Sequence, residues 1–131
     1  MNPLRIESAA AMAAIQGDLP DMLLLPGRAV LLPASQTLLV ADLHLGKAAT
    51  FRRAGIPVPE GSAQRDLARL ERLICEHAVR RLVVLGDLFH AKSGCTPQVY
   101  DEFSAFRSRL GETAVVLVLG NHDRAIGRLP D

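Results

Sequence analysis

Three short, almost entirely apolar segments constrain the fold of this chain more than any other feature of its sequence. They span residues 37–41, 81–86 and 114–119, and helical periodicity is found between them, over residues 62–78 and 97–110. Apolar strands that alternate with helices are typical of parallel βαβ units, in which the strands are covered on both faces. The sequence therefore predicts an α/β fold with a parallel core.

The periodicity of the apolar residues sets the expected helices. Ser62 is expected to cap a helix whose apolar positions recur every three or four residues as far as Ala78, and Pro97 begins the second helix. The two aromatic residues on the apolar face of that second helix, Phe103 and Phe106, are expected to lie in the core.

The chain before the first buried strand has two different parts. Residues 22–25 and 29–32 are expected to form an antiparallel hairpin or meander that leads into that strand. Residues 1–20 are weakly patterned, fit a short helix or a mobile arm, and indicate no function. We therefore expect an N-terminal segment, 1–20, and one domain over 21–131.

Charge and composition narrow the classes of function. The chain has 131 residues, 49% of them hydrophobic, and a formal net charge of +1. One globular domain fits these values, whereas a disordered chain or a broadly basic coat for nucleic acid does not. No stretch approaches the roughly 20 apolar residues of a membrane span, and no signal peptide is recognised. We expect a cytoplasmic protein without a membrane partner, with Cys75 and Cys95 as free thiols.

Basic side chains gather shortly after the first buried strand. Lys47, Arg52 and Arg53 are placed to contact the phosphates of a nucleic-acid strand, and a solvated basic face is an equally good interpretation. Because the net charge is close to zero, any polyanion has to be bound locally.

A polar cluster follows each of the three apolar segments. Residues 42–44 (DLH) follow the first segment, residues 86–90 (GDLFH) the second and residues 120–123 (GNHD) the third. Ligands of open α/β sheets bind outside the carboxyl ends of the strands. The three clusters are therefore expected to converge in one crevice.

The residue types in these clusters favour a metal centre. Aspartate, asparagine and histidine supply oxygen and imidazole ligands that suit manganese, iron or zinc. Residues i and i+2 of a strand point the same way, so Asp42 and His44 can reach one ion. Taken singly, each cluster also fits a structural role, with Asp87 as a helix cap and residues 120–123 as a type I turn. Their occurrence at three strand ends makes the metal centre the better interpretation.

The clusters resemble the first three motifs of the calcineurin-like metallophosphoesterases, which are Asp-x-His, Gly-Asp-x-x-His and Gly-Asn-His-Asp. Longer stretches are more closely similar to the ligase-associated DNA damage response endonucleases (PdeM): residues 37–52 (TLLVADLHLGKAATFR), 55–59 (GIPVP) and 81–88 (RLVVLGDL). The resemblance covers about residues 23–124. It implies the N-terminal part of an α/β/β/α sandwich, with a mixed sheet that contains parallel βαβ units.

The resemblance also implies a two-metal site. Two divalent ions, with manganese expected, would activate a water molecule for attack on a phosphodiester. Asp42 and His44 would bind the first ion, Asp87 would bridge both ions and Asn121 would bind the second.

Three further residues receive catalytic roles from the same resemblance. His122 would donate a hydrogen bond or a proton to the phosphate, and Asp123 would hold the ring of His122. His90 occupies a place where related double-strand-break repair nucleases also carry a histidine. It would help to position the scissile phosphate, or else donate a hydrogen bond behind the metal ligands.

The function implied is that of a metal-dependent DNA endonuclease, associated in repair with a DNA ligase and a helicase. Two alternatives stay open. One is a phosphatase or pyrophosphohydrolase that acts on a small nucleotide-type substrate. The other is an inactive, truncated interaction module. The sequence does not indicate an oligomeric state.

The chain departs from the family pattern after residues 120–123. Family members continue with a further metal-binding histidine and a Gly-His-x-His motif, whereas no histidine follows His122. We expect a fragment of a longer domain, whose apolar strands leave an exposed edge where a second sheet would pack. The 131-residue chain is expected to bind manganese weakly and to hydrolyse bis-p-nitrophenyl phosphate poorly.

Overall fold

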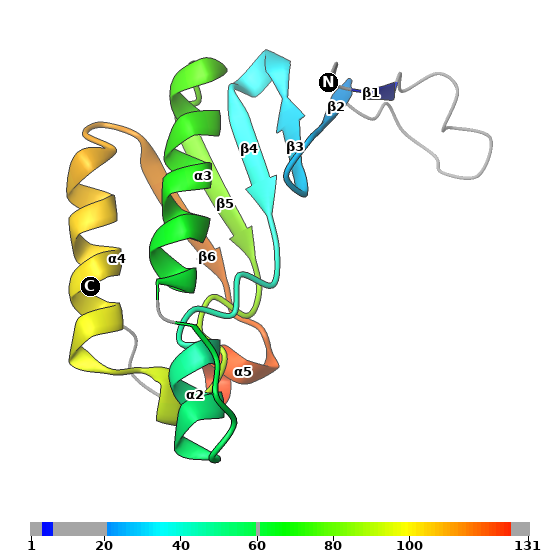
Figure 1. The fold of residues 1–131 in the computed structure, drawn as a ribbon. Helices are drawn as coiled ribbons and strands as arrows, with labels where there is room; N and C mark the ends of the chain where they lie inside the picture. The colour runs from blue at the N-terminus through cyan, green and yellow to red at the C-terminus, as the bar shows by residue number, and fades with distance from the viewer. Residues whose placement is uncertain (1–3, 7–20, 60, 127–131) are drawn as a thin grey trace.

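A computed structural model describes residues 4–6, 21–59 and 61–126 of the chain (Figure 1). Strands and helices alternate after an antiparallel beginning. In chain order, the elements are β1 (Leu4–Ile6), β2 (Met22–Leu25), β3 (Ala29–Leu32), η2 (Pro33–Ser35), β4 (Thr37–Val40), α2 (Lys47–Arg53), α3 (Ser62–Glu76), β5 (Arg81–Leu85), η3 (Lys92–Gly94), α4 (Pro97–Arg109), β6 (Ala114–Val118) and α5 (Asn121–Ile126).

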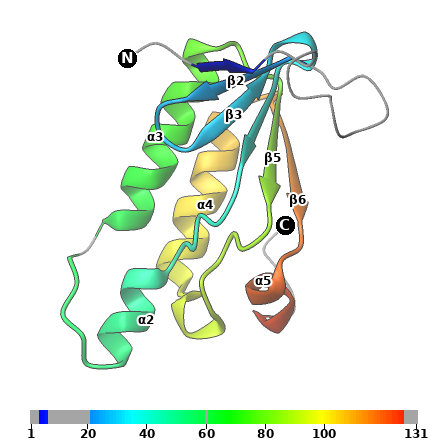
Figure 2. The ribbon, with the colours of Figure 1, turned by 90° about the vertical axis from the view of Figure 1, so that its right-hand side faces the viewer.

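The strands form one mixed sheet of six strands, in the order β1-β2-β3-β4-β5-β6. The pairs β1–β2, β2–β3 and β3–β4 are antiparallel, and the pairs β4–β5 and β5–β6 are parallel. The expected meander and the expected parallel units are both confirmed. Parallel pairing brings the carboxyl ends of β4, β5 and β6 to the same edge of the sheet, where α2 and α5 also lie (Figure 2).

Helices α3 and α4 cover one face of this sheet, as Figure 2 shows. Alternate residues of β4 and β5 point to that face, and Leu38, Val40, Leu82 and Val84 are buried there. Phe106 of α4 is fully buried against them, and Phe103 belongs to the same core, which confirms the place expected for both rings. One hydrophobic core therefore lies between the sheet and the two helices.

The opposite face of the sheet carries apolar side chains that remain accessible to solvent. Leu85 of β5 and Val116 and Val118 of β6 are 46%, 42% and 50% exposed. The expectation that the parallel strands are covered on both faces is wrong for the described residues. Within them, all the long helices lie on one side, and β6 ends the sheet.

The two long helices begin by different means. Gly61, with a left-handed φ of 84°, is the N-cap of α3, so Ser62 is the first helical residue and the expected cap is misplaced by one position. Helix α4 begins at Pro97 as expected, and the side chain of Thr96 caps it by accepting a hydrogen bond from Val99 N at 3.2 Å. Proline suits this first position because the helix needs no donor there.

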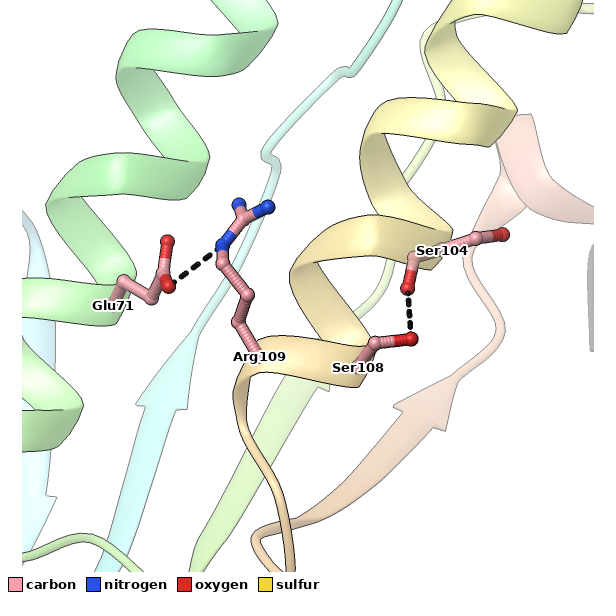
Figure 3. Close-up of polar contacts among 4 residues, drawn as sticks. All are labelled: Glu71, Ser104, Ser108 and Arg109. Atoms are coloured by element: carbon pink, nitrogen blue, oxygen red, sulfur yellow. Dashed lines mark hydrogen bonds and ion pairs between the residues drawn. The ribbon is translucent and has the colours of Figure 1, made fainter.

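Helices α3 and α4 are joined at their solvent side by an ion pair. Arg109 Nε donates to Glu71 Oε1 at 2.8 Å, and Ser108 on the same turn of α4 bonds back to the carbonyl of Ser104 at 3.1 Å (Figure 3). The hydrogen bond to Glu71 raises the pKa of Arg109 above its ordinary value. No helix of the described residues is long and apolar enough to cross a membrane.

Apart from the two short 3-10 helices η2 and η3, three elements of the structure were not expected from the sequence. Residues Leu4–Ile6 pair with β2 as strand β1 rather than forming a helix, and residues 7–20 of the expected N-terminal segment lie outside the described part. Helix α2 directly follows the first polar cluster, and α5 begins within the third. Both helices are short, seven and six residues, so their periodicity is weak in the sequence.

Candidate metal centre

The loops that follow β4 and β5 are joined by backbone hydrogen bonds. The bonds continue the parallel ladder beyond the last residues of both strands, and an isolated parallel bridge extends it further. The bonds join Asp42 N to Gly86 O (3.2 Å), His44 N to Asp87 O (3.0 Å) and Leu45 N to Leu88 O (2.8 Å). The first and second polar clusters therefore have a fixed register relative to each other.

Asp42, His44 and Asp87 form a cluster of candidate metal ligands in these loops. Each side chain offers one ligand atom, and the three atoms lie within 4.8 Å of one another. Asp42 is exposed, and the other two residues are half-buried, so the group opens to solvent. Two carboxylates and one imidazole are suitable donors for manganese, iron or zinc. The donor set therefore fits a divalent cation, and the role of each residue as a ligand stays a prediction.

The backbone is left-handed at all three residues. The φ angles of Asp42, His44 and Asp87 are 51°, 48° and 51°. Such conformations cost about 1–3 kcal/mol each for residues other than glycine and are concentrated at functional sites. The prediction that Asp42 and His44 point the same way as residues of a strand is wrong, because β4 ends at Val40. Their side chains converge from a left-handed loop instead.

Gly120 leaves space for the carboxylate of Asp87. A Cβ atom added at Gly120 would lie 2.7 Å from Asp87 N and 2.9 Å from Asp87 Cγ. A Cβ atom added at Gly86 would lie 3.4 Å from the Cα atom of Gly120. The glycines of the second and third clusters therefore allow the two loops to approach closely around Asp87.

Asp123 connects the second and third clusters and is only 1% exposed. Its Oδ1 atom accepts hydrogen bonds from the backbone N–H groups of Leu88 (2.9 Å) and Phe89 (3.3 Å), and its Oδ2 atom accepts one from Gly120 N (2.9 Å). A carboxylate with three such donors holds the loops after β5 and β6 together. Its predicted contact with the ring of His122 stays a prediction.

The third cluster forms the beginning of α5. Asn121 is the first residue of this helix and is exposed, directly after the glycine that lies against Asp87. His122 follows in the same helix, and its side chain lies outside the described part of the chain. The backbone thus brings the third cluster to the edge where Asp42 and His44 lie, as expected.

His90 adjoins the ligand cluster through its ring. The centroids of the His90 and His44 rings are 5.4 Å apart in an edge-to-face arrangement. The centroid of the Phe51 ring, on α2, lies 5.8 Å from that of His90, also edge-to-face. The Nδ1 atoms of both histidines are buried. Phe51 was not among the expected site residues. Its position seven residues after His44 carries no recognisable signal in the sequence, because α2 itself was not expected.

Two further ionisable groups, Cys95 and Tyr100, contact the loop that follows β5. Cys95 Sγ donates to the carbonyl of Ala91 at 3.4 Å, and the Tyr100 ring lies 5.5 Å from the Phe89 ring. Burial raises the pKa of the Cys95 thiol, a side-chain hydrogen bond with Tyr100 lowers it by less, and the charge of Asp123 raises it. Burial also raises the pKa of Tyr100, and its hydrogen bond with Cys95 adds to this increase. Both cysteines are free, as expected.

Comparisons with known proteins agree with this arrangement. The model of the calcineurin-like phosphoesterase family matches residues 36–131. The crystal structure of Pseudomonas putida nuclease MPE has a TM-score of 0.77 to this chain and 35% sequence identity. That match covers 99% of this chain and 56% of the nuclease, so the chain spans little more than half of its length. A comparison with curated proteins found no match.

Proposed function

The chain belongs to the calcineurin-like phosphoesterase family, and from this premise we propose that it hydrolyses phosphodiester bonds of DNA with bound divalent metal ions. One observation carries the proposal. Asp42, His44 and Asp87 come from two strand ends and place their ligand atoms within 4.8 Å of one another. The similar structure from Pseudomonas putida is that of a nuclease, which favours a nucleic-acid substrate over a small phosphoester.

In this proposal Asp42 and His44 would hold the first ion, Asp87 would serve as a ligand of both ions and Asn121 would hold the second. Divalent ions in such a site, when bound, activate water and stabilise the negative charge that develops on the phosphate. The chain contributes the fixed geometry of the ligands, since backbone hydrogen bonds and the carboxylate of Asp123 set the positions of the loops.

The remaining histidines would act on the substrate. His122 would donate a hydrogen bond or a proton to the phosphate, and His90 would position the phosphate beside the ligand cluster. The ring contact of His90 with His44 supports this role, because it places an imidazole at the rim of the metal centre.

Three finer points belong to the same proposal. We propose manganese as the metal, the cytoplasm as the compartment, and a role in DNA repair beside a ligase and a helicase. Their support is the resemblance of residues 37–52 and 81–88 to the ligase-associated endonucleases.

The substrate class is tested by incubating the chain with Mn²⁺ and three substrates: single-stranded DNA, a mononucleotide and a phosphomonoester. We expect slow cleavage of the single-stranded DNA and no hydrolysis of the mononucleotide or the phosphomonoester. Hydrolysis of the small substrates without cleavage of DNA would favour the phosphatase or pyrophosphohydrolase alternative. A complementation test in which Asp42→Ala and His122→Ala retain the biological role would favour the interaction module.

The metal centre is tested by measuring free Mn²⁺ by electron paramagnetic resonance during titration of the chain. Asp87→Ala is expected to abolish the binding that the chain shows, since it removes the bridging carboxylate. Asp101→Ala is the matched control, because Asp101 is an exposed carboxylate on α4. Equal binding by the two variants would contradict the assignment of the metal centre.

A further inference from the structure

Lys47 lies next to the metal centre, at the beginning of α2 and three residues after His44. Its Nζ atom is 5.4 Å from the centroid of the Phe51 ring. The Phe51 ring contacts His90, and the His90 ring contacts His44. A continuous series of side-chain contacts therefore leads from the ammonium group to a candidate metal ligand.

Helix α2 is held in place by close backbone packing against η3. A Cβ atom added at Gly94 would lie 2.7 Å from Thr50 Oγ1 and would overlap the backbone of Gly46, and the converse holds for a Cβ atom at Gly46. Two glycines thus let the beginning of α2 contact the loop after β5. The position of Lys47 relative to the metal centre is set by this packing.

The basic residues of α2 do not share one environment. Lys47 and Phe51 are separated by four residues and lie on the same side of the helix. Arg52 lies on another side of the helix and lines a cavity of about 180 Å³ together with Glu102. Among the described residues, no carboxylate forms an ion pair with the exposed Lys47. The charge of Lys47 is thus accessible to solvent, and the rings of Phe51 and His90 connect it to His44.

We infer that Lys47 binds a phosphate of the substrate strand other than the scissile one, and so favours polynucleotides over mononucleotides. The inference rests on the proposed function. A strand carries a further phosphate at every nucleotide, whereas a mononucleotide has none to offer beyond the one that reacts. An ammonium group binds phosphate as a compact point charge, and its contact with the Phe51 ring keeps it near the metal centre.

The test measures binding of a fluorescent oligo(dT) by anisotropy, in EDTA and over a series of salt concentrations. One phosphate contact contributes about 0.7 to the slope of log K against log salt for a single strand. Lys47→Gln is expected to reduce the slope by about that amount, and Lys47→Arg is expected to retain it. Arg52→Gln is the matched control and removes the same charge from the cavity side of the same helix.

Three outcomes would overturn the inference: an unchanged slope in Lys47→Gln, an equal loss in Arg52→Gln, or no DNA binding by the parent chain. Circular dichroism of each variant shows whether it is folded, and Lys47→Arg separates loss of charge from loss of structure. EDTA removes catalysis from the measurement. DNA binding in EDTA and hydrolysis with Mn²⁺ are therefore measured separately. If Lys47→Gln leaves the salt slope unchanged while the parent chain still hydrolyses DNA with Mn²⁺, the inference fails and the proposed function does not.

Discussion

At the scale of the residue, Asp123 shows how one buried carboxylate serves as a structural connector. It accepts hydrogen bonds from backbone groups of two different loops, and both loops contribute to the candidate metal centre. The sequence placed Asp123 in the third cluster but could not indicate these partners. Leu88 and Phe89 are 35 and 34 residues away along the chain. Every residue type except proline has a backbone N–H group, so the residue types at these positions do not reveal that they donate hydrogen bonds.

The first prediction concerns this connector. Asp123→Ala leaves three backbone N–H groups without their acceptor, and a buried unsatisfied group costs about 1–3 kcal/mol. We expect the free energy of unfolding to fall by at least about 2 kcal/mol and Mn²⁺ affinity to fall with it. Urea denaturation and the Mn²⁺ titration measure the two effects. Asp101→Ala, on the exposed side of α4, should change neither quantity.

A second prediction at this scale follows from the raised pKa of Cys95. Because its pKa is above that of an ordinary thiol, a smaller fraction of Cys95 is thiolate at any pH near 8, and thiolate is the reactive form. Cys75 is exposed and serves as the internal reference. Iodoacetamide labelling with mass spectrometry should modify Cys95 more slowly than Cys75 at pH 8, and the rate at Cys95 should increase as the pH rises toward the raised pKa of its thiol. Faster labelling of Cys95 at pH 8 would be inconsistent with its environment.

At the scale of the element, the long helices and the strands were predictable, and the short elements were not. Helix α4 begins at the expected Pro97 because proline and the capping Thr96 act locally. Strands β4, β5 and β6 are continuous apolar runs that the sequence shows directly. Helix α2 is different, because its position depends on Gly46 and Gly94 fitting together across 48 residues of chain.

The third prediction tests that fit. Gly94→Ala places a methyl group against Thr50 Oγ1 and the backbone of Gly46, so α2 has to move away from η3. Overpacking of this kind costs about 1–3 kcal/mol. Urea denaturation should show that loss. Gly111→Ala is the control, because nothing lies within 4 Å of its added Cβ atom and only backbone strain at its φ of 61° is introduced. Parental stability in Gly94→Ala would mean that the packing of α2 against η3 is not tight.

At the scale of the whole molecule, the sheet has one covered and one open face. Burial alternates along β6, where Val115 and Leu117 pack against the core while Val116 and Val118 are accessible. The sequence could not distinguish the faces, since every residue of this strand is apolar. The alternation of buried and accessible residues along β6 arises because the helices lie on one side of the sheet. A contiguous apolar face of this kind favours association.

The fourth prediction concerns the open face. The chain is expected to increase the fluorescence of a hydrophobic dye such as ANS, and the double variant Val116→Thr/Val118→Thr is expected to reduce that increase without a large loss of stability. Val115→Thr is the control on the same strand, because its side chain faces the core. It should lower stability and leave dye binding at the parental level or above. Equal dye binding by the double variant and the parent chain would show that the face is not the binding surface.

The hydrogen-bond ladder between the loops after β4 and β5 also bears on which sequence changes the metal centre tolerates. Its bonds use backbone atoms alone, from Asp42 N and Gly86 O to Leu45 N and Leu88 O. Point substitutions of the non-glycine residues between the ligands are therefore expected to leave the register of the two loops unchanged. Insertion or deletion of a single residue between the end of β4 and His44, or between the end of β5 and Asp87, would shift every bond beyond it and separate His44 from Asp87. We therefore expect natural variants of this site to keep the length of each loop constant, whereas the side chains between the ligands are free to differ.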